Sequence, residues 1–188
     1  VASTYRIGEQ GALSLTDNPF DLAINGEGFF QIQLPDGDTG YTRDGSFQLN
    51  ADGQLVNADG FPLVPNITID QAAVGITINQ NGQVLLKFDG QQAETIAGTV
   101  QLATFQNKAG LEHIGRNLLK TTEASGAATT ANPGAAGFGS LEQGFVEASN
   151  VDPVQEITDL IQAQRGYELN SKVIETADQM MSAVNNVR

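Results

Sequence analysis

The chain has 188 residues, enough for one domain of ordinary size and an additional segment. Its 22 acidic residues outnumber 9 Lys and Arg residues and give a net charge of −13. This balance argues against a nucleic-acid partner and against an anionic membrane surface, since both need clustered basic side chains. The sequence contains no cysteine, so disulfides and thiolate chemistry are excluded. No apolar run approaches the ~18 residues that a membrane-spanning helix needs, and no membrane insertion is expected.

Residues 1–16 are mostly polar, with scattered apolar positions, and we interpret them as the end of an N-terminal hinge or linker. From 17 to 120, short runs of β-branched and aromatic residues alternate with polar ones, as in 29–34 and 75–78. This alternation is typical of half-buried strands. Asp-Gly and Asn-Gly pairs separate the runs and favour tight hairpin turns, because glycine accepts positive φ without strain. The sequence therefore predicts a mainly β outer domain over 17–120.

The hairpin turns resemble one another within this domain. Residues 49–56 and 78–85 share a pattern in which Asn is followed three positions later by Gly and then by Gln. Two copies do not establish a solenoid repeat. The pattern instead favours the recurrence of one good hairpin turn.

Two segments separate this domain from the end of the chain. Residues 121–140 consist largely of Gly, Ala, Ser and Thr and offer almost nothing to bury. This composition predicts a flexible loop. Residues 141–151 begin with a strand-like stretch, and we interpret them as a hinge strand.

A long helix is predicted over 152–188. Asp152 can cap its N-terminus, Pro153 suits the first helical position, and Gln155 can complete a capping-box pair. No proline follows, which at ~1.5 Å per residue gives a helix about 50 Å long.

Apolar side chains recur every seven residues along this helix, a spacing typical of a coiled-coil seam. The expected seam positions lie on two neighbouring lines and are Leu160, Ala163, Tyr167, Asn170, Ile174, Ala177, Met181 and Val184. A second apolar set on the first two turns, Val154, Ile157 and Ile161, faces elsewhere. The alternative is a helix that packs on its own domain, which is the commoner fate of amphipathic helices. Because a helix of this length would extend past a β domain of this size, contacts with other chains are favoured.

The sequence offers little for catalysis or metal binding. His113 is the only histidine, so a metal site built from several imidazoles is excluded. Asp36 and Asp38 flank a glycine as in a calcium loop, but Phe47 stands where that loop needs glutamate. We therefore predict no catalytic residue, no metal site and no cofactor, and a structural protein rather than an enzyme.

Four longer motifs follow one another along the chain. They are D-L-A-I-N-G-E-G-F-F at 21–30, Y-T-R-D-G-S-F at 41–47, Q-G-F-V-E-A-S-N-V at 143–151 and Q-A-Q-R-G-Y-E-L-N-S-K at 162–172. Together they resemble the β domain, the hinge and the closing helix of the bacterial flagellar basal-body rod and hook family. The motif residues that carry this resemblance are Gly26, Gly28, Phe29, Phe30, Thr42, Arg43, Asp44, Gly45, Gly144, Ser149, Asn150, Gln164, Arg165, Asn170, Ser171 and Lys172.

The resemblance implies a function. Within the family, the runs 170–172 and 177–180 are most similar to the distal rod members. A distal rod subunit would polymerise through its terminal helices into a hollow drive shaft that transmits torque from motor to hook and lines an export channel. The implied assembly is a helical homo-oligomer, with other rod proteins, the hook protein and the P- and L-ring proteins as partners. The implied location is the periplasm-spanning rod of the basal body, reached by export without a cleaved signal peptide.

Two features depart from the family pattern. The family's N-terminal helix, the expected partner of the C-terminal one, is missing here, and we expect it to lie outside this chain, which begins at Val1 rather than Met. Gly166 stands where the family usually has alanine, at a cost of about 1 kcal/mol in helix propensity.

Two other interpretations stay open. The chain is another rod or hook subunit of the same family, or it is a β-rich binding module on a coiled-coil stalk. A binding module of that kind needs an exposed aromatic platform. The sequence has no tryptophan and 3 tyrosines, which disfavours it.

Overall fold

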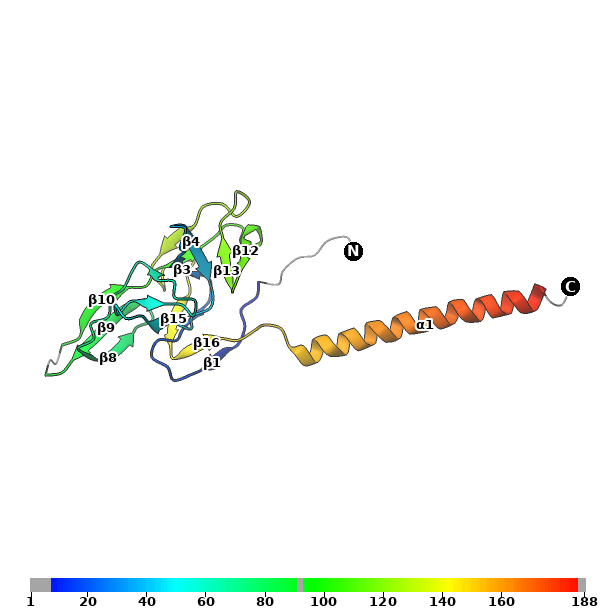
Figure 1. The fold of residues 1–188 in the computed structure, drawn as a ribbon, viewed down its shortest axis with the longest axis horizontal. Coiled ribbons are helices and arrows are strands. Elements are labelled where there is room, and N and C mark those ends of the chain that lie inside the picture. The colour runs from blue at the N-terminus through cyan, green and yellow to red at the C-terminus, as the bar shows by residue number, and fades with distance from the viewer. Residues whose placement is uncertain (1–7, 91–92, 186–188) are drawn as a thin grey trace. The chain divides into compact units, whose positions relative to one another are not determined.

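The chain divides into a β domain and a single long helix. The computed structural model describes residues 8–90 and 93–185, with the helix side chains described as far as Ser182. The chain separates into two compact units, Val1–Ala148 and Ser149–Arg188. The described strands belong to the first unit, and helix α1 (Pro153–Asn185) belongs to the second (Figure 1). The prediction of a mainly β domain followed by a long C-terminal helix is confirmed.

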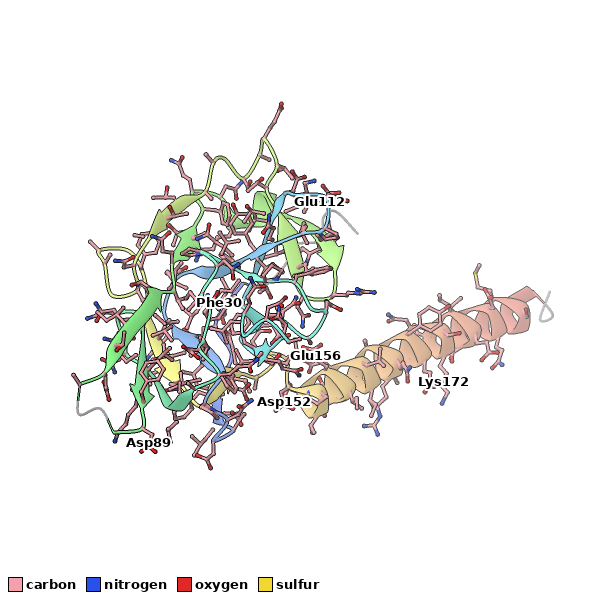
Figure 2. The ribbon with its side chains drawn as sticks, turned by 60° about the vertical axis from the view of Figure 1, so that its left-hand side comes forward. Phe30, Asp89, Glu112, Asp152, Glu156 and Lys172 are labelled. Atoms are coloured by element: carbon pink, nitrogen blue, oxygen red, sulfur yellow. The ribbon has the colours of Figure 1, made fainter. Side chains whose placement is uncertain are left out.

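The largest sheet of the β domain is antiparallel and has the order β12-β13-β4-β3-β11-β14, with β7 also paired to β3. Its strands are β3 (Phe29–Gln33), β4 (Thr39–Thr42), β7 (Leu63–Val64), β11 (Leu102–Thr104), β12 (Glu112–Gly115), β13 (Leu118–Lys120) and β14 (Thr129–Ala131). Successive side chains of β3 point to opposite faces of the sheet. Phe30 therefore lies in the main core, edge-on to Phe47 with ring centroids 5.1 Å apart, whereas Phe29 packs with Phe105 in a separate cluster. Figure 2 shows Phe30 among the side chains in the middle of the domain.

The remaining strands form a three-stranded sheet, in the order β10-β9-β8, and three two-stranded pairs, β1-β16, β15-β2 and β5-β6. Their bounds are β1 (Leu13–Leu15), β2 (Leu22–Asn25), β5 (Gln48–Leu49), β6 (Leu55–Val56), β8 (Ala73–Ile78), β9 (Gln83–Phe88), β10 (Thr95–Thr99), β15 (Ser140–Gln143) and β16 (Phe145–Glu147). A short 3₁₀ helix, Lys108–Gly110, lies between β11 and β12.

The main core joins strands that are far apart in the sequence. Leu22 on β2, Leu102 on β11 and Leu141 on β15 are among its fully buried side chains. Each side chain of this kind stabilises the fold by about 1.5–3 kcal/mol relative to an exposed one. Strand β15, near the end of the first unit, is therefore part of the domain core.

Three hairpin turns share one hydrogen-bonding design, built on Asn50, Asn57 and Asn79. In each turn the Asn Oδ1 accepts the backbone N–H groups two and four residues further on, at 2.9–3.1 Å. The backbone O of the same Asn accepts the N–H of the glycine three residues on, at 2.9–3.0 Å. The predicted recurrence of one hairpin turn is confirmed, and Asn57 adds a copy that the sequence comparison missed because no Gln follows its glycine.

Residues 121–140, which we expected to form a flexible loop, are docked on the β domain. Strand β14 lies within this segment and pairs with β11. Phe138 packs against the main core, and the N–H of Gly139 donates to the O of Glu27 at 2.7 Å. The expectation was wrong because it counted apolar side chains, whereas backbone hydrogen bonds hold most of this segment.

The chain ends of the β domain also differ from the expected hinge segments. β15 pairs with β2, and its Leu141 is 1% exposed, so the first part of the expected hinge at 141–151 belongs to the core. β1, in the expected linker at 1–16, pairs with β16 (Figure 1). The compact unit ends at Ala148. Residues 1–7 of the expected linker lie outside the described residues.

A side chain at position 45 is expected to disrupt the core. An added Cβ on Gly45 would lie 1.6 Å from the backbone O of Leu22, where the two segments are joined by a hydrogen bond of 3.0 Å. Gly45→Ala should lower the free energy of unfolding by about 3 kcal/mol or more, measured by urea denaturation. Gly75→Ala is the matched control, because its Cβ would meet Lys87 at an ordinary 3.8 Å. Equal losses in the two variants would contradict the packing argument.

Candidate functional site

The helix α1 begins as the sequence predicts. The Oδ1 of Asp152 accepts the N–H of Val154 at 2.9 Å, and its backbone O accepts the N–H of Glu156 at 3.1 Å. Pro153 is the first helical residue. Figure 2 shows Asp152 and Glu156 at the N-terminal end of the helix, where the helix dipole stabilises carboxylates.

The second half of the expected capping box is not formed. The Nε2 of Gln155 donates to the Oδ1 of Asp159, one turn further on, at 3.1 Å. A hydrogen bond between exposed side chains four residues apart is the usual alternative for a glutamine in the first turn of a helix.

The described seam residues of α1 are exposed. Leu160 is 58% exposed, Tyr167 78%, Ile174 63% and Met181 71%. Their companions Ala163, Asn170 and Ala177 are exposed as well, and the side chain of Val184 lies outside those described. A single helix has no second element in its own unit, so these apolar side chains have nothing there to pack against.

Sequence reasoning missed a further apolar line on the second half of the helix. Leu169, Val173 and Met180 are 64%, 67% and 61% exposed. They stand four and seven residues apart and therefore share one face. At about 100° per residue, Leu169 lies opposite Leu160. The i, i+4, i+11 spacing was the available signal, but these residues lie off the two seven-residue lines from which the seam was predicted.

Apolar side chains thus project from more than one side of α1. The set Val154, Ile157 and Ile161 lies on the first turns and is 71%, 57% and 43% exposed. A two-stranded coiled coil covers one narrow seam. Burial of all these residues therefore needs more than one neighbouring helix.

In the β domain, Arg43 brings three of the sequence motifs together. Its Nε donates to the Oε2 of Glu147 at 2.8 Å, from the motif at 143–151. Its Nη1 and Nη2 donate to the O atoms of Gly28 and Gly26 at 3.2 and 3.0 Å, in the motif at 21–30. The guanidinium carbon also lies 5.9 Å from the ring centroid of Phe29, within the range of a cation–π contact.

The first and last strands of the β domain, β1 and β16, pair next to the contact of Arg43 with Glu147. β1 and β16 pair with Leu13 opposite Glu147 and Leu15 opposite Phe145. The ladder continues on both sides, since Ala148 donates to the O of Ala12 and Thr16 donates to the O of Gly144, each at 2.8 Å. Both terminal segments therefore leave the β domain at the Leu13–Glu147 end.

Two further motif residues fix this end of the chain. Gly144 has φ +80°, a left-handed conformation that favours glycine, and its N–H donates to the O of Asp21 at 2.8 Å. Gln143 uses its whole carboxamide: Nε2 donates to the O of Pro19 at 2.8 Å, and Oε1 accepts the N–H of Ile78 at 3.0 Å. β15 is thereby tied to two other parts of the domain.

The remaining motif residues lie in turns or on the helix. The Oδ1 of Asp44 accepts the N–H and the Oγ–H of Ser46, and its own N–H donates to the Oγ1 of Thr42 at 3.0 Å. Ser149 accepts the N–H of Val151 through Oγ at 3.2 Å. The exposed motif residues of the second unit are Ser149, Asn150, Gln164, Arg165, Asn170, Ser171 and Lys172.

Nothing in the described residues indicates a reaction centre. No three acidic, histidine or cysteine side chains within 8–90 and 93–185 are placed to hold a metal ion. Burial raises the pKa of Tyr41, and the hydrogen bond that the Lys120 ammonium donates to the Asp38 carboxylate raises the pKa of Lys120. Both shifts keep the group in the form it already has at neutral pH. In the same part of the chain, no helix combines the length and the apolar character that crossing a membrane requires.

Comparison with known proteins gives consistent matches over most of the chain. Residues 23–86 match the D1 domain of the flagellar hook protein FlgE/F/G, and residues 142–187 match the C-terminal domain of the flagellar basal body rod FlgEFG proteins. The chain is 56% identical over 186 residues to the flagellar basal-body rod protein FlgG of Caulobacter vibrioides, covering 99% of this chain and 71% of the relative. It is 48% identical over 185 residues to FlgG of Buchnera aphidicola subsp. Acyrthosiphon pisum, covering 98% and 71%. It is 36% identical over 183 residues to the rod protein FlgF of Caulobacter vibrioides, covering 95% and 69%.

Loss of the Asp152 carboxylate should weaken the start of the helix. Asp152→Ala leaves the N–H of Val154 without its acceptor, and we expect the first turn to lose about 1 kcal/mol of stability. Hydrogen exchange at residues 154–157 measures this loss. Asp152→Asn is the matched control, because asparagine also caps helices. If Asn and Ala exchange equally fast, charge rather than the cap stabilises the turn.

Proposed function

The chain belongs to the flagellar basal-body rod protein family and within it is most like FlgG, and from this membership we infer that it acts as a subunit of the distal rod through the exposed apolar surface of α1. It is a structural subunit of the flagellar basal body. In our proposal, α1 packs against helices of neighbouring subunits in a hollow helical polymer. That polymer transmits torque from motor to hook and surrounds an export channel.

The observation that carries this proposal is the exposure of large apolar side chains along α1. Leu160, Ile174 and Met181 are each more than half exposed. Burial of one such side chain contributes about 1.5–3 kcal/mol, and this contribution becomes available when another helix covers it. Helices in proteins owe most of their stability to the packing of an apolar face rather than to propensity, so α1 is expected to become more stable on assembly.

The two-sided distribution of apolar residues supports a polymer over a simple pair. Leu169 and Leu160 lie on opposite sides of α1, so one partner helix cannot cover both. Contacts with at least two neighbours extend an assembly in a way that a closed dimer does not. Coiled-coil-like packing of the Leu160–Met181 line is one part of this arrangement.

The proposal also includes partners at the ends and sides of the rod. Other rod proteins and the hook protein would continue the shaft, and the P- and L-ring proteins would surround the β domains. The other rod and hook subunits of the family are weaker candidates for the identity of this chain, because its identity to FlgF is 36% against 56% to FlgG in the same organism.

A charge on the predicted seam should block assembly without unfolding the β domain. Ile174→Asp places a carboxylate where an apolar helix contact is expected, a costly arrangement at low dielectric. Position 174 lies in the second compact unit, so the melting curve of the β domain should be unchanged. Cells that carry the variant in the full-length protein should secrete the subunit yet lack hooks and motility.

Gln179→Asp is the matched control for this variant. It adds the same charge five residues further on, on the side of α1 where Glu168, Lys172 and Glu175 stand. We expect normal hooks with this variant. Normal hooks with Ile174→Asp, or a lower melting temperature of its β domain, would count against the seam.

A further inference from the structure

We propose that Arg43 and Glu147 form a clamp that holds the two terminal segments of the β domain together where they leave it. Because α1 follows the C-terminal segment, the clamp would pass a load from the helix to the β domain through both segments rather than through the C-terminal one alone. Its purpose rests on the proposed rod function, whereas the closure of the strands can be measured on the chain by itself.

The two strands that the clamp joins, β1 and β16, are only weakly stabilised by their own pairing. β1 and β16 pair over three residues each, and they form a sheet of their own. Leu15 is 59% exposed, and no residue of either strand is fully buried. A two-stranded ribbon without a buried face is marginal in water. The ladder therefore needs another interaction to stay closed.

The register of β1 with β16 shows where the two segments would first separate. Leu13 stands opposite Glu147 at the end where one segment enters and the other leaves. Separation of the two segments would begin there, because the other end is held by the bonds of Thr16 and Asp21 to Gly144. An added ion pair stabilises the ladder most at the end where the two strands begin to separate.

Glu147 connects both segments to the domain from this position. Its Oε2 accepts from the Nε of Arg43 at 2.8 Å, and its Oε1 accepts the N–H of Gly11 at 2.9 Å. One carboxylate thus bonds to the N-terminal segment and to the residue after β4. The side chains of Arg43 and Glu147 are 23% and 13% exposed, so water and salt screen the pair less than a surface pair.

Neighbouring contacts hold the clamp in position. Arg43 is itself fixed by the carbonyl groups of Gly26 and Gly28. Gln10 adds a second tie, since its Nε2 donates to the O of Ile24 at 2.7 Å and its Oε1 accepts the N–H of Gly26 at 3.0 Å. The end of β2 is therefore the common support for both segments.

Hydrogen exchange of the 188-residue chain tests the clamp directly. In Arg43→Ala, the N–H of Ala148, which bonds to the O of Ala12, should exchange about tenfold faster or more, as expected for local opening. The core amides of Leu22 and Val100, bonded to Gly45 and Gly82, should keep their rates. Arg116→Ala is the matched control, because it removes an arginine from the more exposed ion pair with Asp59.

A disulfide in place of the ion pair distinguishes closure from a general effect on the fold. The chain has no cysteine, so Leu13→Cys and Glu147→Cys, added to Arg43→Ala, can form a single bridge across a directly opposed pair. Both charges are then absent, and neither is left unpaired. Exchange at Ala148 should be slow in the oxidised protein and fast in the reduced protein.

Unchanged exchange at Ala148 in Arg43→Ala, or equal acceleration at the core amides, would overturn the clamp. So would an oxidised bridge that fails to restore slow exchange. These outcomes do not depend on rod assembly, which the Ile174→Asp variant tests separately. In cells, the full-length Arg43→Ala protein should build hooks but support slower swimming in viscous medium than the Arg116→Ala protein, and equal swimming would overturn the role in transmission.

Discussion

The β domain depends on the pairing of β2, near its start, with β15, near its end. β15 pairs with β2, which sets Leu141 opposite Ile24, and both side chains are buried in the main core. Leu22 and Ile24 of β2 share this core with Leu141 of β15, so the core is complete only when residues 140–143 are in place. Contacts of such long sequence separation carry a large loop-closure cost, which the core must offset. The same closure fixes the point from which both terminal segments leave.

Helix α1 differs from the β domain in the burial of its apolar residues. The β domain buries its apolar residues within one chain, whereas α1 exposes residues such as Tyr167 and Val173 over most of its described length. In the proposed rod, their burial contributes free energy only when helices of neighbouring subunits cover them. On the proposed function, the division of the chain at Ala148 separates a part that folds by itself from a part that becomes stable on assembly.

Much of this organisation could be predicted from local sequence. The Asn-Gly and Asp-Gly turns, the strand 29–33 and the start of α1 at Asp152 follow from short-range chemistry, because glycine conformation and helix capping act within a few residues. The docking of 121–140 could not be predicted, since β14 is held by backbone pairing and its side chains carry no apolar pattern. The contact of Arg43 with Glu147 escaped prediction for another reason: each residue stands in its own motif, and the fold alone brings them together.

The hydrogen bonds on two glycine nitrogens have a consequence for the chemical durability of the protein. An asparagine followed by glycine loses ammonia when the glycine nitrogen attacks the asparagine side chain, and the chain has two such pairs, Asn25-Gly26 and Asn81-Gly82. In both, that nitrogen is engaged: Gly26 donates to the Oε1 of Gln10 and Gly82 donates to the O of Asn79. The attack requires this hydrogen bond to break first, so its rate depends on the local stability of the structure around each glycine. The hydrogen bonds on the nitrogens of Gly26 and Gly82 should therefore also slow the chemical ageing of the chain.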